Sequence, residues 1–366
     1  LRQKNDKTHN LYLLSKYHVI STGGSSGKRG IFIYDKNEWI TFFSSYSRYP
    51  LLNQDRTEFV TKKLNPNSKA VYLGISNTAT AAYAFLRIFQ LYNNNLYYLP
   101  MATTPLHDVI TRLNQMMPHI IIAPPSYVHK LCQLIKIRQL RIKPKIIFVG
   151  AEPLFELTQA LIKETWPKVD LFNAYGCCEG LTGKICGANR EEMHLNDDQC
   201  IAEPLDAQNR PVGPGALASK MYLTNLYNYT LPLIRYENYD NILLLNKTCD
   251  CGNQHQLIST PKDRPGCDFN FPGNIVVHHS LFVGPLLLES NIQEYQIAQT
   301  RDGFDIKILT TGSIDKSKLK QNLRLRLSKV GFSNAKVNII EVSEFAYLPS
   351  GKLGRFIPLS PNSIKE

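Results

Sequence analysis

The chain has 366 residues, of which 43% are hydrophobic and 20% are charged, a composition that indicates a globular protein with a sizeable core. Its length exceeds the size at which a single core usually stops growing, so two domains are expected. The sequence contains no apolar run long enough to cross a membrane and no secretory signal. Eight cysteines in such a chain indicate reduced thiols and a cytoplasmic location.

The 42 basic and 30 acidic residues give a formal net charge of +12. Such an excess suits nucleic acid, an anionic membrane surface or polyanionic small molecules, and the charge alone does not choose among them. Because no nucleic-acid recognition module is present and no segment spans a membrane, small polyanionic ligands are the favoured partners.

The first informative segment is a loop of small residues. It can wrap a polyphosphate through successive backbone N–H groups and flanking hydroxyls. The P-loop of nucleotide hydrolases is excluded, since Thr22 stands where its first glycine belongs and Arg29 where its metal-binding hydroxyl belongs. The segment 31–34 has the character of a returning strand, which predicts a mobile hairpin loop. The loop residues are Ser21, Thr22, Gly23, Gly24, Ser25, Ser26, Gly27 and Lys28.

Between Lys69 and Ala174, short apolar runs alternate with amphipathic stretches. This alternation predicts a parallel sheet with crossover helices. Asp35 and Glu38 are spaced as a capping box for a helix that contains Trp39. Thr104 and Ser126 are expected to cap two further helices. Residues 154–165 are expected to form a third crossover helix. The predicted strands are 70–75, 96–99, 119–123, 145–149 and 170–173.

Two loops follow directly on the last two of these strands. In open α/β sheets ligands bind at the carboxyl ends of the strands, so these loops can enclose a purine, with Tyr175 as a stacking face. Glu179 lies one short turn further, where a carboxylate suits Mg²⁺. The loop residues are Gly150, Ala151, Glu152 and Pro153, and then Ala174, Tyr175 and Gly176.

After Gly180 the pattern changes to strands and loops, with clear strands at 218–224 and 241–245, which predicts a β subdomain over about 181–262. Asp240 follows a strand-like run, where it can be a carboxylate that accepts two hydrogen bonds from a ligand or a solvated turn residue. From residue 263 a compact α+β domain is expected, with a strand at 306–309, a helix at 316–330 and a strand at 336–342. The predicted domains are therefore 1–262 and 263–366.

The cysteines near the end of the first domain have a partial zinc-site pattern. Cys249 and Cys251 with His255 look like half a zinc knuckle, and the loop after Glu179 can supply the remaining ligands. The alternative is that these cysteines are small core residues. The residues that can complete the site are Cys186, His194 and Cys200.

Five segments in this order, with GIFIYD at 30–35 and TLPLIRY at 230–236, resemble the acyl-adenylate-forming superfamily. The phenylacetate-CoA ligase-like branch is the most similar, and the resemblance runs from about Ser21 to Leu359. It implies a large N-terminal domain and a small mobile C-terminal α+β domain. It also implies ATP-dependent activation of an aryl or acyl carboxylate to an acyl adenylate, followed by transfer to a thiol, with ATP, Mg²⁺ and coenzyme A as cofactors. The five segments are 21–28, 150–153, 175–179, 235–240 and 350–352.

The resemblance assigns roles to these residues. The first loop holds the β and γ phosphates, the 150–153 and 174–176 loops contact adenine, and Glu179 holds Mg²⁺. Cys178 stands where the family has a hydroxyl residue. Asp240 and, in a looser match, Arg264 contact the ribose. Lys352 supplies the cation for adenylation, since negative charge gathers on the phosphate oxygens in the transition state.

Alternatives remain open at the level of the sequence. The acyl group can pass to a carrier-protein thiol or an amine, or the chain can be a degenerate nucleotide-binding protein. The start at Leu1 and the short segment before the first loop suggest a form that lacks part of the N-terminal domain, and a homodimer is left open. The carboxylate is not predicted, because its pocket is expected from aromatic and apolar residues scattered between Trp39 and Tyr175.

Overall fold

The computed structural model describes residues 12–14, 16–22, 30–52, 67–74, 80–92, 95–101, 104–185, 187, 191–240, 242–261, 268–273, 275–289, 291–346 and 353–359. The chain divides into two compact units, Leu1–Asp263 and Arg264–Glu366.

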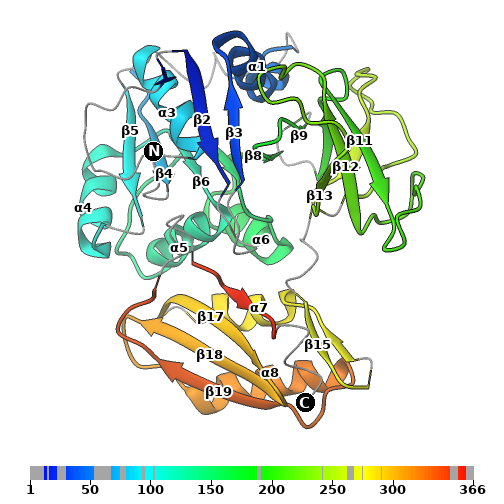
Figure 1. The fold of residues 1–366 in the computed structure, drawn as a ribbon. Coiled ribbons are helices and arrows are strands. Elements are labelled where there is room, and N and C mark those ends of the chain that lie inside the picture. Colours follow the sequence, from blue (N-terminus) through cyan, green and yellow to red (C-terminus); the bar gives the residue numbers. More distant parts are fainter. Residues whose placement is uncertain are drawn as a thin grey trace. The chain divides into compact units, whose positions relative to one another are not determined.

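The first unit is built on a large sheet whose order, within the described residues, is β14-β10-β9-β8-β7-β6-β4-β5 (Figure 1). Neighbours from β5 to β8 pair in parallel, and β9, β10 and β14 continue the sheet in antiparallel pairs. The sheet strands are β4 (Ala70–Gly74), β5 (Leu96–Pro100), β6 (Ile120–Ala123), β7 (Ile146–Gly150), β8 (Asp170–Gly176), β9 (Thr182–Ile185), β10 (Glu192–Leu195) and β14 (Leu257–Ser259).

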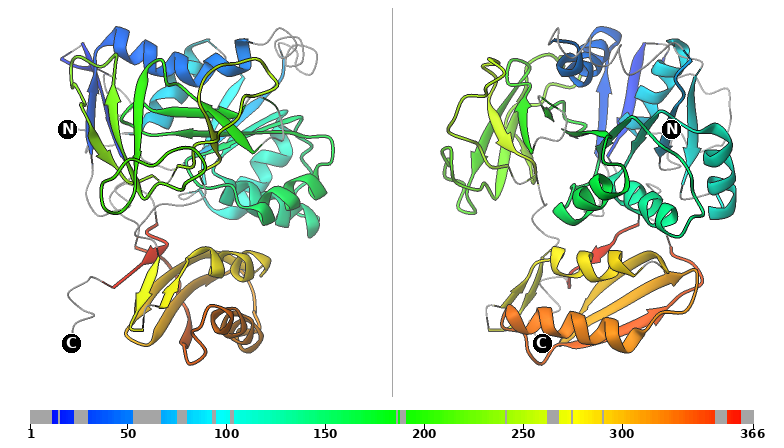
Figure 2. Two further views of the ribbon diagram at one scale, coloured as in Figure 1. Left: turned by 90° about the vertical axis from the view of Figure 1, so that its right-hand side faces the viewer. Right: turned by 180° about the vertical axis from the view of Figure 1, so that it is seen from behind.

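Helices cover both faces of the parallel part of this sheet, as the two views of Figure 2 show. Alternate strand residues such as Val71, Ile121 and Ile147 are completely buried in one core with α4, α5 and α6, while Ala70 and Ile120 pack toward α3 on the other face. This alternation is the two-sided burial expected of a parallel sheet. The α/β fold class predicted from the sequence is confirmed. The helices are α3 (Ala81–Tyr92), α4 (Leu106–Met116), α5 (Pro125–Lys136) and α6 (Glu156–Thr165).

An antiparallel hairpin and a long helix precede the large sheet. Strands β1 (Tyr12–Leu13), β2 (Tyr17–Ser21) and β3 (Ile31–Tyr34) form a small sheet, and α1 (Lys36–Leu52) follows. The start of α1 is a capping box: Glu38 N donates to Asp35 Oδ1 (2.8 Å), and Asp35 N donates to Glu38 Oε2 (2.7 Å). The predicted helix start and its capping residues are confirmed.

Two other predicted caps were wrong. No side-chain cap bond forms at the start of α4 or α5, where the N-cap residues are Pro105 and Pro124. Ser126 lies inside α5, and its backbone N–H donates instead to Glu152 Oε2 (3.3 Å). A carboxylate from the loop after β7 therefore supplies the negative charge that the start of α5 favours.

The region after Gly180 divides between two sheets. While β9, β10 and β14 extend the large sheet, β11 (Cys200–Leu205), β12 (Lys220–Asn225) and β13 (Tyr236–Asn238) form a second, antiparallel one. The strand predicted at 241–245 is wrong: the described residues there make isolated bridges, Leu217 to Leu243 and Leu244 to Ile258. Ile242 and Leu244 are buried, as the apolar pattern indicates, but the two bridges go to different partners and form no ladder.

The second unit has a four-stranded sheet, ordered β19-β18-β17-β20 within the described residues, and a small hairpin. Its core joins Phe269, Phe282, Phe304 and Ile306 to the buried face of α8, which includes Leu323. The elements are β15 (Phe269–Phe271), β16 (Ile275–Val277), α7 (Ser280–Leu288), β17 (Ile292–Thr300), β18 (Gly303–Thr310), α8 (Lys316–Lys329), β19 (Lys336–Glu341) and β20 (Phe356–Ile357). Among the described residues of the chain, no helix combines the length and apolar character needed to cross a membrane.

Candidate functional site

The small-residue loop is closed at its base by the hairpin of β2 and β3. Ser21 pairs with Ile31, Thr22 N donates to Gly30 O (3.0 Å), and Gly30 N donates to Thr22 Oγ1 (2.9 Å). The prediction of a returning strand in place of a helix is therefore confirmed. Thr22 Oγ1 is used in closing the loop, and Ser21 is buried, so these two residues support the loop from its base.

The turn that contains Glu179 is held by polar side chains from outside it. Gly180 N donates to Cys177 O (3.2 Å), and Cys177 N donates to Leu181 O (3.0 Å). Asn225 Nδ2, at the end of β12, donates to Glu179 O (2.8 Å), and Asn196 Nδ2 donates to Gly180 O (3.1 Å). Glu179 itself is only 7% exposed. The sequence analysis missed both asparagines, because nothing in their local pattern shows that they reach this turn.

Gly180 is required in this turn for two reasons. Its φ is +109°, a backbone conformation that residues with side chains rarely adopt. A Cβ atom there would also collide with Asn225 Nδ2 and the Tyr227 hydroxyl. The glycine therefore lets the second sheet approach the Glu179 turn closely.

The hairpin and the Glu179 turn lie against each other. Tyr34, at the end of β3 and completely buried, donates its hydroxyl to Cys178 O (2.6 Å). The Cys178 side chain packs against the aromatic cluster that Tyr34 forms with Trp39 and Phe42. The hairpin that carries the predicted phosphate loop therefore contacts the predicted metal-binding turn through Tyr34, at the end of β3 opposite the loop, although Tyr34 and Glu179 are 145 positions apart in the sequence.

The loop between β12 and β13 of the second sheet contacts both α1 and β3. Glu38 Oε1 accepts hydrogen bonds from Tyr229 N (2.8 Å) and Thr230 N (2.9 Å), in addition to the capping box of Oε2. Asn228 Nδ2 donates to Ile33 O (3.0 Å). Glu38, which the sequence indicated only as a cap, therefore joins α1 to the segment that precedes β13.

The loop after β7 shows why its small residues are needed. A Cβ atom at Gly150 would lie 2.9 Å from Ala174 O, so the glycine permits the close pairing of β7 with β8. Ala151 has a φ of +65°, in the left-handed region that is unfavourable for alanine. Glu152 turns its carboxylate to the start of α5, as described above, and it is partly buried. The 150–153 and 174–176 loops are adjacent through the pairing of Gly150 with Ala174.

Tyr175 and Asp240 are in direct contact. The Tyr175 hydroxyl donates to Asp240 Oδ2 (2.7 Å), and burial of the phenol raises its pKa well above the usual range. The phenol therefore stays protonated at neutral pH and acts as the donor. Asp240 is 5% exposed, and its backbone N–H donates to Asn238 Oδ1 (2.8 Å). Asp240 is therefore a positioned carboxylate, and the alternative of a solvated turn residue is wrong.

Lys184 is a cation near this region that the sequence analysis missed. It pairs with Ala174 across the β8–β9 ladder, and its Nζ lies over the Tyr46 ring, 5.2 Å from the ring centroid. Within the described residues no carboxylate lies within ion-pair distance of this amine, and burial lowers its pKa to about 7. A Cβ atom at Gly176 would collide with the Tyr46 hydroxyl, so Gly176 makes room for this aromatic neighbour. A lone lysine in a short strand carries no sequence signal for such a position.

Among the described residues, Trp39, Phe42 and Phe85 pack together and do not line an open pocket. Trp39 is 2% exposed and Phe42 is completely buried, in a cluster with Phe85. The expectation that Trp39 helps to line the substrate pocket is therefore corrected: this side chain belongs to the core, where large aromatic residues bury the most surface.

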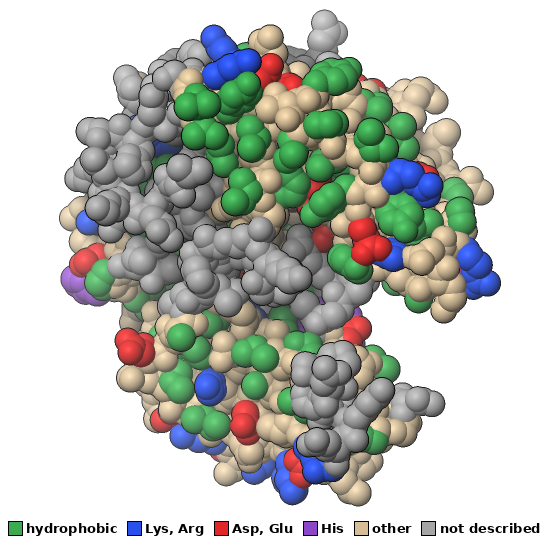
Figure 3. All heavy atoms as spheres, in the orientation of Figure 1, with side chains coloured by type: hydrophobic (Ala, Val, Ile, Leu, Met, Phe, Trp, Pro, Cys, Tyr) green, Lys and Arg blue, Asp and Glu red, His purple; other side chains and the backbone are tan. Residues whose placement is uncertain are grey.

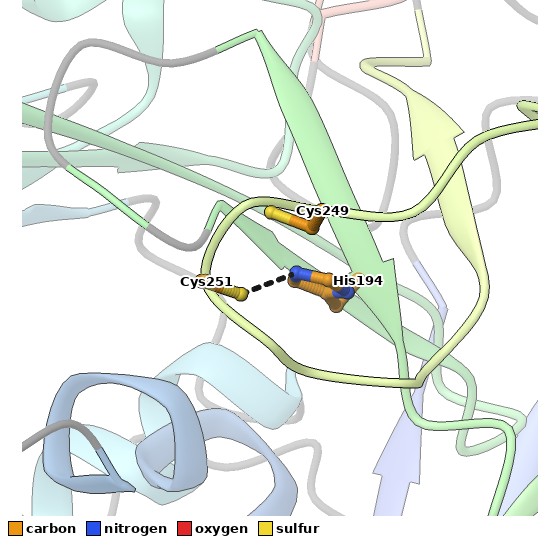
Figure 4. Close-up of side chains that lie close together, drawn as sticks. All are labelled: His194, Cys249 and Cys251. Atoms are coloured by element: carbon orange, nitrogen blue, oxygen red, sulfur yellow. Dashed lines mark hydrogen bonds between the residues drawn. The ribbon is translucent and has the colours of Figure 1, made fainter.

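Three of the predicted zinc ligands, one on β10 and two on the loop before β14, lie together, as Figure 4 shows. The ligand atoms of His194, Cys249 and Cys251 all lie within 4.8 Å of one another, and His194 Nε2 is 3.3 Å from Cys251 Sγ. His194 Nδ1 is 3.1 Å from His255 O, which fixes the ring so that Nε2 faces the two thiols. One imidazole and two thiols are a donor set that suits Zn²⁺.

The remaining candidates for that site lie elsewhere. Cys200 is completely buried in the core between the two sheets, where desolvation raises the pKa of its thiol. His255 is paired with Asp197 through Nδ1, and its backbone carbonyl supports His194. The interpretation of Cys200 and the His255 ring as direct ligands is therefore wrong.

Comparison with known proteins adds the family context. No protein-family model matches the chain. A phenylacetate-coenzyme A ligase from Pseudomonas putida is 21% identical over 252 residues, which are 67% of this chain and 54% of that protein. The chain thus spans about half the length of this curated relative.

Solved structures match over nearly the whole chain. A 2-hydroxyisobutyryl-CoA ligase in complex with R3-HIB-AMP superposes with a TM-score of 0.68 at 17% identity, covering 96% of this chain and 75% of the other. An anthranilate CoA ligase in complex with anthranoyl-AMP gives 0.61 at 12% identity, covering 93% and 65%. The chain has the acyl-adenylate-forming ligase fold. The likeness to the phenylacetate-CoA ligase supports the branch that the motifs resemble.

Several candidate site residues predicted from the sequence lie outside the described residues. These are the central part of the small-residue loop and three single candidates, and their roles stay predictions. They are Gly23, Gly24, Ser25, Ser26, Gly27 and Lys28, together with Cys186, Arg264 and Lys352.

The contact between hairpin and turn predicts the effect of Tyr34→Phe. The variant loses the hydrogen bond to Cys178 O, and we expect a loss of about 1 kcal/mol in the free energy of unfolding, measured in urea, because the buried carbonyl loses its donor. Tyr97→Phe, at an exposed tyrosine of β5, is the matched control and should be unchanged. Equal stability of both variants would show that the Tyr34 bond does not hold the hairpin to the turn.

Proposed function

We propose that the protein activates a carboxylic acid with ATP, forms an acyl adenylate with release of pyrophosphate, and transfers the acyl group to a thiol, with coenzyme A as the acceptor. The observation that carries this proposal is the contact of the β2–β3 hairpin with the Glu179 turn. It supports the proposal because it joins the hairpin that carries a loop suited to polyphosphate to the turn that carries Glu179, a carboxylate suited to Mg²⁺.

The residues take distinct roles in this proposal. The loop between Thr22 and Gly30 holds the β and γ phosphates through its N–H groups, with Lys28 as the counter-charge. Asp240 accepts hydrogen bonds from the ribose hydroxyls, and its contact with the Tyr175 hydroxyl orients the carboxylate. Arg264 contributes a second ribose contact. The two loops after β7 and β8 enclose the adenine, because both lie at the carboxyl ends of parallel strands.

Glu179 fits the role of a Mg²⁺ ligand by its chemistry. It supplies hard carboxylate oxygens from a turn whose backbone is fixed by Asn225 and Asn196. The ion, when bound, neutralises charge on the departing pyrophosphate. Cys178 takes the place of a hydroxyl residue in this turn, and its side chain packs against the aromatic cluster. The contact that a hydroxyl would make to the phosphate is therefore left to the backbone of the turn.

Lys352 completes the proposed chemistry. The carboxylate oxygen of the substrate attacks the α-phosphorus, a P–O bond to the acyl group forms, and the bond to the pyrophosphate oxygen breaks. An ammonium group at this point stabilises the charge that develops on the oxygens. In the second step the thiol attacks the acyl carbon and AMP leaves.

The direct test is carboxylate-dependent exchange of labelled pyrophosphate into ATP across a panel of aryl and aliphatic acids. Exchange with at least one acid supports adenylation, and coenzyme A-dependent release of AMP then identifies the acceptor. AMP release that requires a carrier-protein thiol or an amine instead would replace the acceptor but keep the first step. Tight ATP binding without exchange for any acid would favour a degenerate nucleotide-binding protein.

We further propose that His194, Cys249 and Cys251 bind Zn²⁺, with Cys186 as the fourth ligand. Cys186 follows Ile185, which pairs with Met193 next to His194. Such a site would join β9 and β10 of the large sheet to the loop before β14 and would have a structural role.

The zinc proposal predicts a measurable change on metal removal. Treatment with a strong chelator should lower the melting temperature of the protein, and one equivalent of Zn²⁺ should restore it, because binding to the folded state stabilises it. Cys251→Ser should melt at a lower temperature than the untreated wild-type protein, and the chelator should lower its melting temperature by less. A melting temperature that is the same with and without chelator would contradict the proposal.

A further inference from the structure

A second group of side chains that can bind a metal ion lies in the second unit. Asp268 comes directly before β15, and His278 and His279 come directly after β16. The two strands pair with Phe269 opposite Val277, so Asp268 and His278 flank the same end of this hairpin. The ligand atoms of the three side chains lie within 4.8 Å of one another.

The spacing of these atoms does not correspond to direct hydrogen bonds. Asp268 Oδ1 is 3.7 Å from His278 Nε2 and 3.6 Å from His279 Nδ1, distances beyond those of a normal hydrogen bond. Asp268 Oδ1 is buried and makes no hydrogen bond among the described residues. Two atoms bound to one tetrahedral metal ion at about 2.0–2.2 Å lie about 3.3–3.6 Å apart, so the observed spacing suits a shared cation.

Packing fixes the orientation of the rings. The His279 side chain is 5% exposed, and its ring lies 4.5 Å from that of Phe356 and 4.6 Å from that of His278, measured between centroids. Phe356 packs against the core of the unit. The His278 side chain is 43% exposed, which gives an ion and a water molecule access to the group. The three ligands therefore form a largely preformed site that is open on one side.

We propose that Asp268, His278 and His279 bind a divalent transition-metal ion. Two imidazoles and one carboxylate favour Zn²⁺ or Co²⁺ over Mg²⁺ or Ca²⁺, which prefer all-oxygen sites. The open side leaves a coordination position for water. The bound ion would fasten the β15–β16 hairpin to the start of α7, where His279 is the N-cap residue. This site does not depend on the proposed adenylation or on the cysteine site.

The experiment uses Co²⁺ as a spectroscopic probe on the full-length protein. In the Cys249→Ser/Cys251→Ser background the cysteine site loses its thiolates, so any remaining Co²⁺ absorption comes from nitrogen and oxygen ligands. We expect this background to bind one equivalent of Co²⁺ with visible d–d bands and no thiolate charge-transfer band. Adding Asp268→Asn should weaken this binding at least about tenfold, as loss of a ligand does.

A matched control and a second variant keep the test decisive. His107→Gln alters an exposed histidine beside Asp108 on α4 and should leave Co²⁺ binding unchanged. If Asp268→Asn does not fold, His278→Gln at the more exposed ring provides the same test. Absence of Co²⁺ binding in the background protein would overturn the proposal, and so would binding that survives both the Asp268→Asn and the His278→Gln substitution.

Discussion

The Glu179→Gln variant should lose carboxylate-dependent pyrophosphate exchange by on the order of a hundredfold or more. The amide keeps the size of the side chain but removes the charge that the metal–nucleotide complex requires. Because the backbone of the turn is held by Asn225 and Asn196, the variant should still fold, and its melting temperature should stay close to that of the wild type. The measurement is the initial rate of exchange at several Mg²⁺ concentrations.

A control separates this effect from a general loss of charge. Glu164→Gln removes an exposed carboxylate that pairs with Lys136 on a neighbouring helix, and it should exchange at the wild-type rate. Glu179→Gln is expected to require more Mg²⁺ for half-maximal rate, whereas Glu164→Gln is not. Wild-type exchange in Glu179→Gln would exclude this carboxylate from the reaction.

The Lys352→Ala variant should lose adenylation by roughly a hundredfold to a thousandfold, while ATP binding changes little. The reason is that the ammonium group acts on charge that is present only in the transition state. The exchange rate measures the first effect, and equilibrium binding of ATP measures the second. Lys318→Ala, at an exposed lysine of α8, is the control that changes the same type of residue in the same unit.

The second half-reaction, in which the acyl group passes from the adenylate to the thiol, separates a role in adenylation from a general defect. When synthetic acyl adenylate and coenzyme A are supplied, Lys352→Ala should form thioester at close to the wild-type rate, since no pyrophosphate bond is broken in this step. Equal losses in both half-reactions would assign Lys352 to folding or to binding of AMP, and unchanged exchange would remove its proposed role.

Local patterns in the sequence predicted the parts of the fold that are decided locally. The parallel strands were predictable because each is a short apolar run between turn residues, and both faces of these strands are buried. The start of α1 was predictable because Asp35 and Glu38 cap the helix within a single turn. The β2–β3 hairpin followed from the apolar run after the loop.

Long-range contacts could not be predicted in the same way. Serine is a common helix-capping residue, but the start of α5 is set by two prolines and Ser126 lies inside the helix. A glutamate from another loop provides the negative charge at the helix start. Tyr175 was expected to offer a ring face, and its hydroxyl contact with Asp240 depends on pairing across 65 residues. Asn225 and Lys184 gave no sequence signal, because their positions depend on how the two sheets and α1 pack.

Surface features also show what composition leaves undetermined. The net charge of +12 did not locate a binding surface. In Figure 3, hydrophobic side chains gather on the visible face of the first unit around β2 and β3. The exposed apolar residues of this hairpin include Ile31, and those of the segment before β13 include Tyr229 and Ile234. The sequence does not predict this gathering, since each residue lies in a different local pattern.

The transfer of ¹⁸O from the carboxylate substrate to AMP tests the central claim most directly. The protein is incubated with ATP, coenzyme A and an acid that supports exchange and carries ¹⁸O in both carboxyl oxygens. The ¹⁸O content of the nucleotide and phosphate products is then measured by mass spectrometry. Attack of the carboxylate on the α-phosphorus predicts AMP that carries one ¹⁸O atom, together with unlabelled pyrophosphate. Formation of ADP with ¹⁸O in inorganic phosphate, or of AMP without label, would contradict the account.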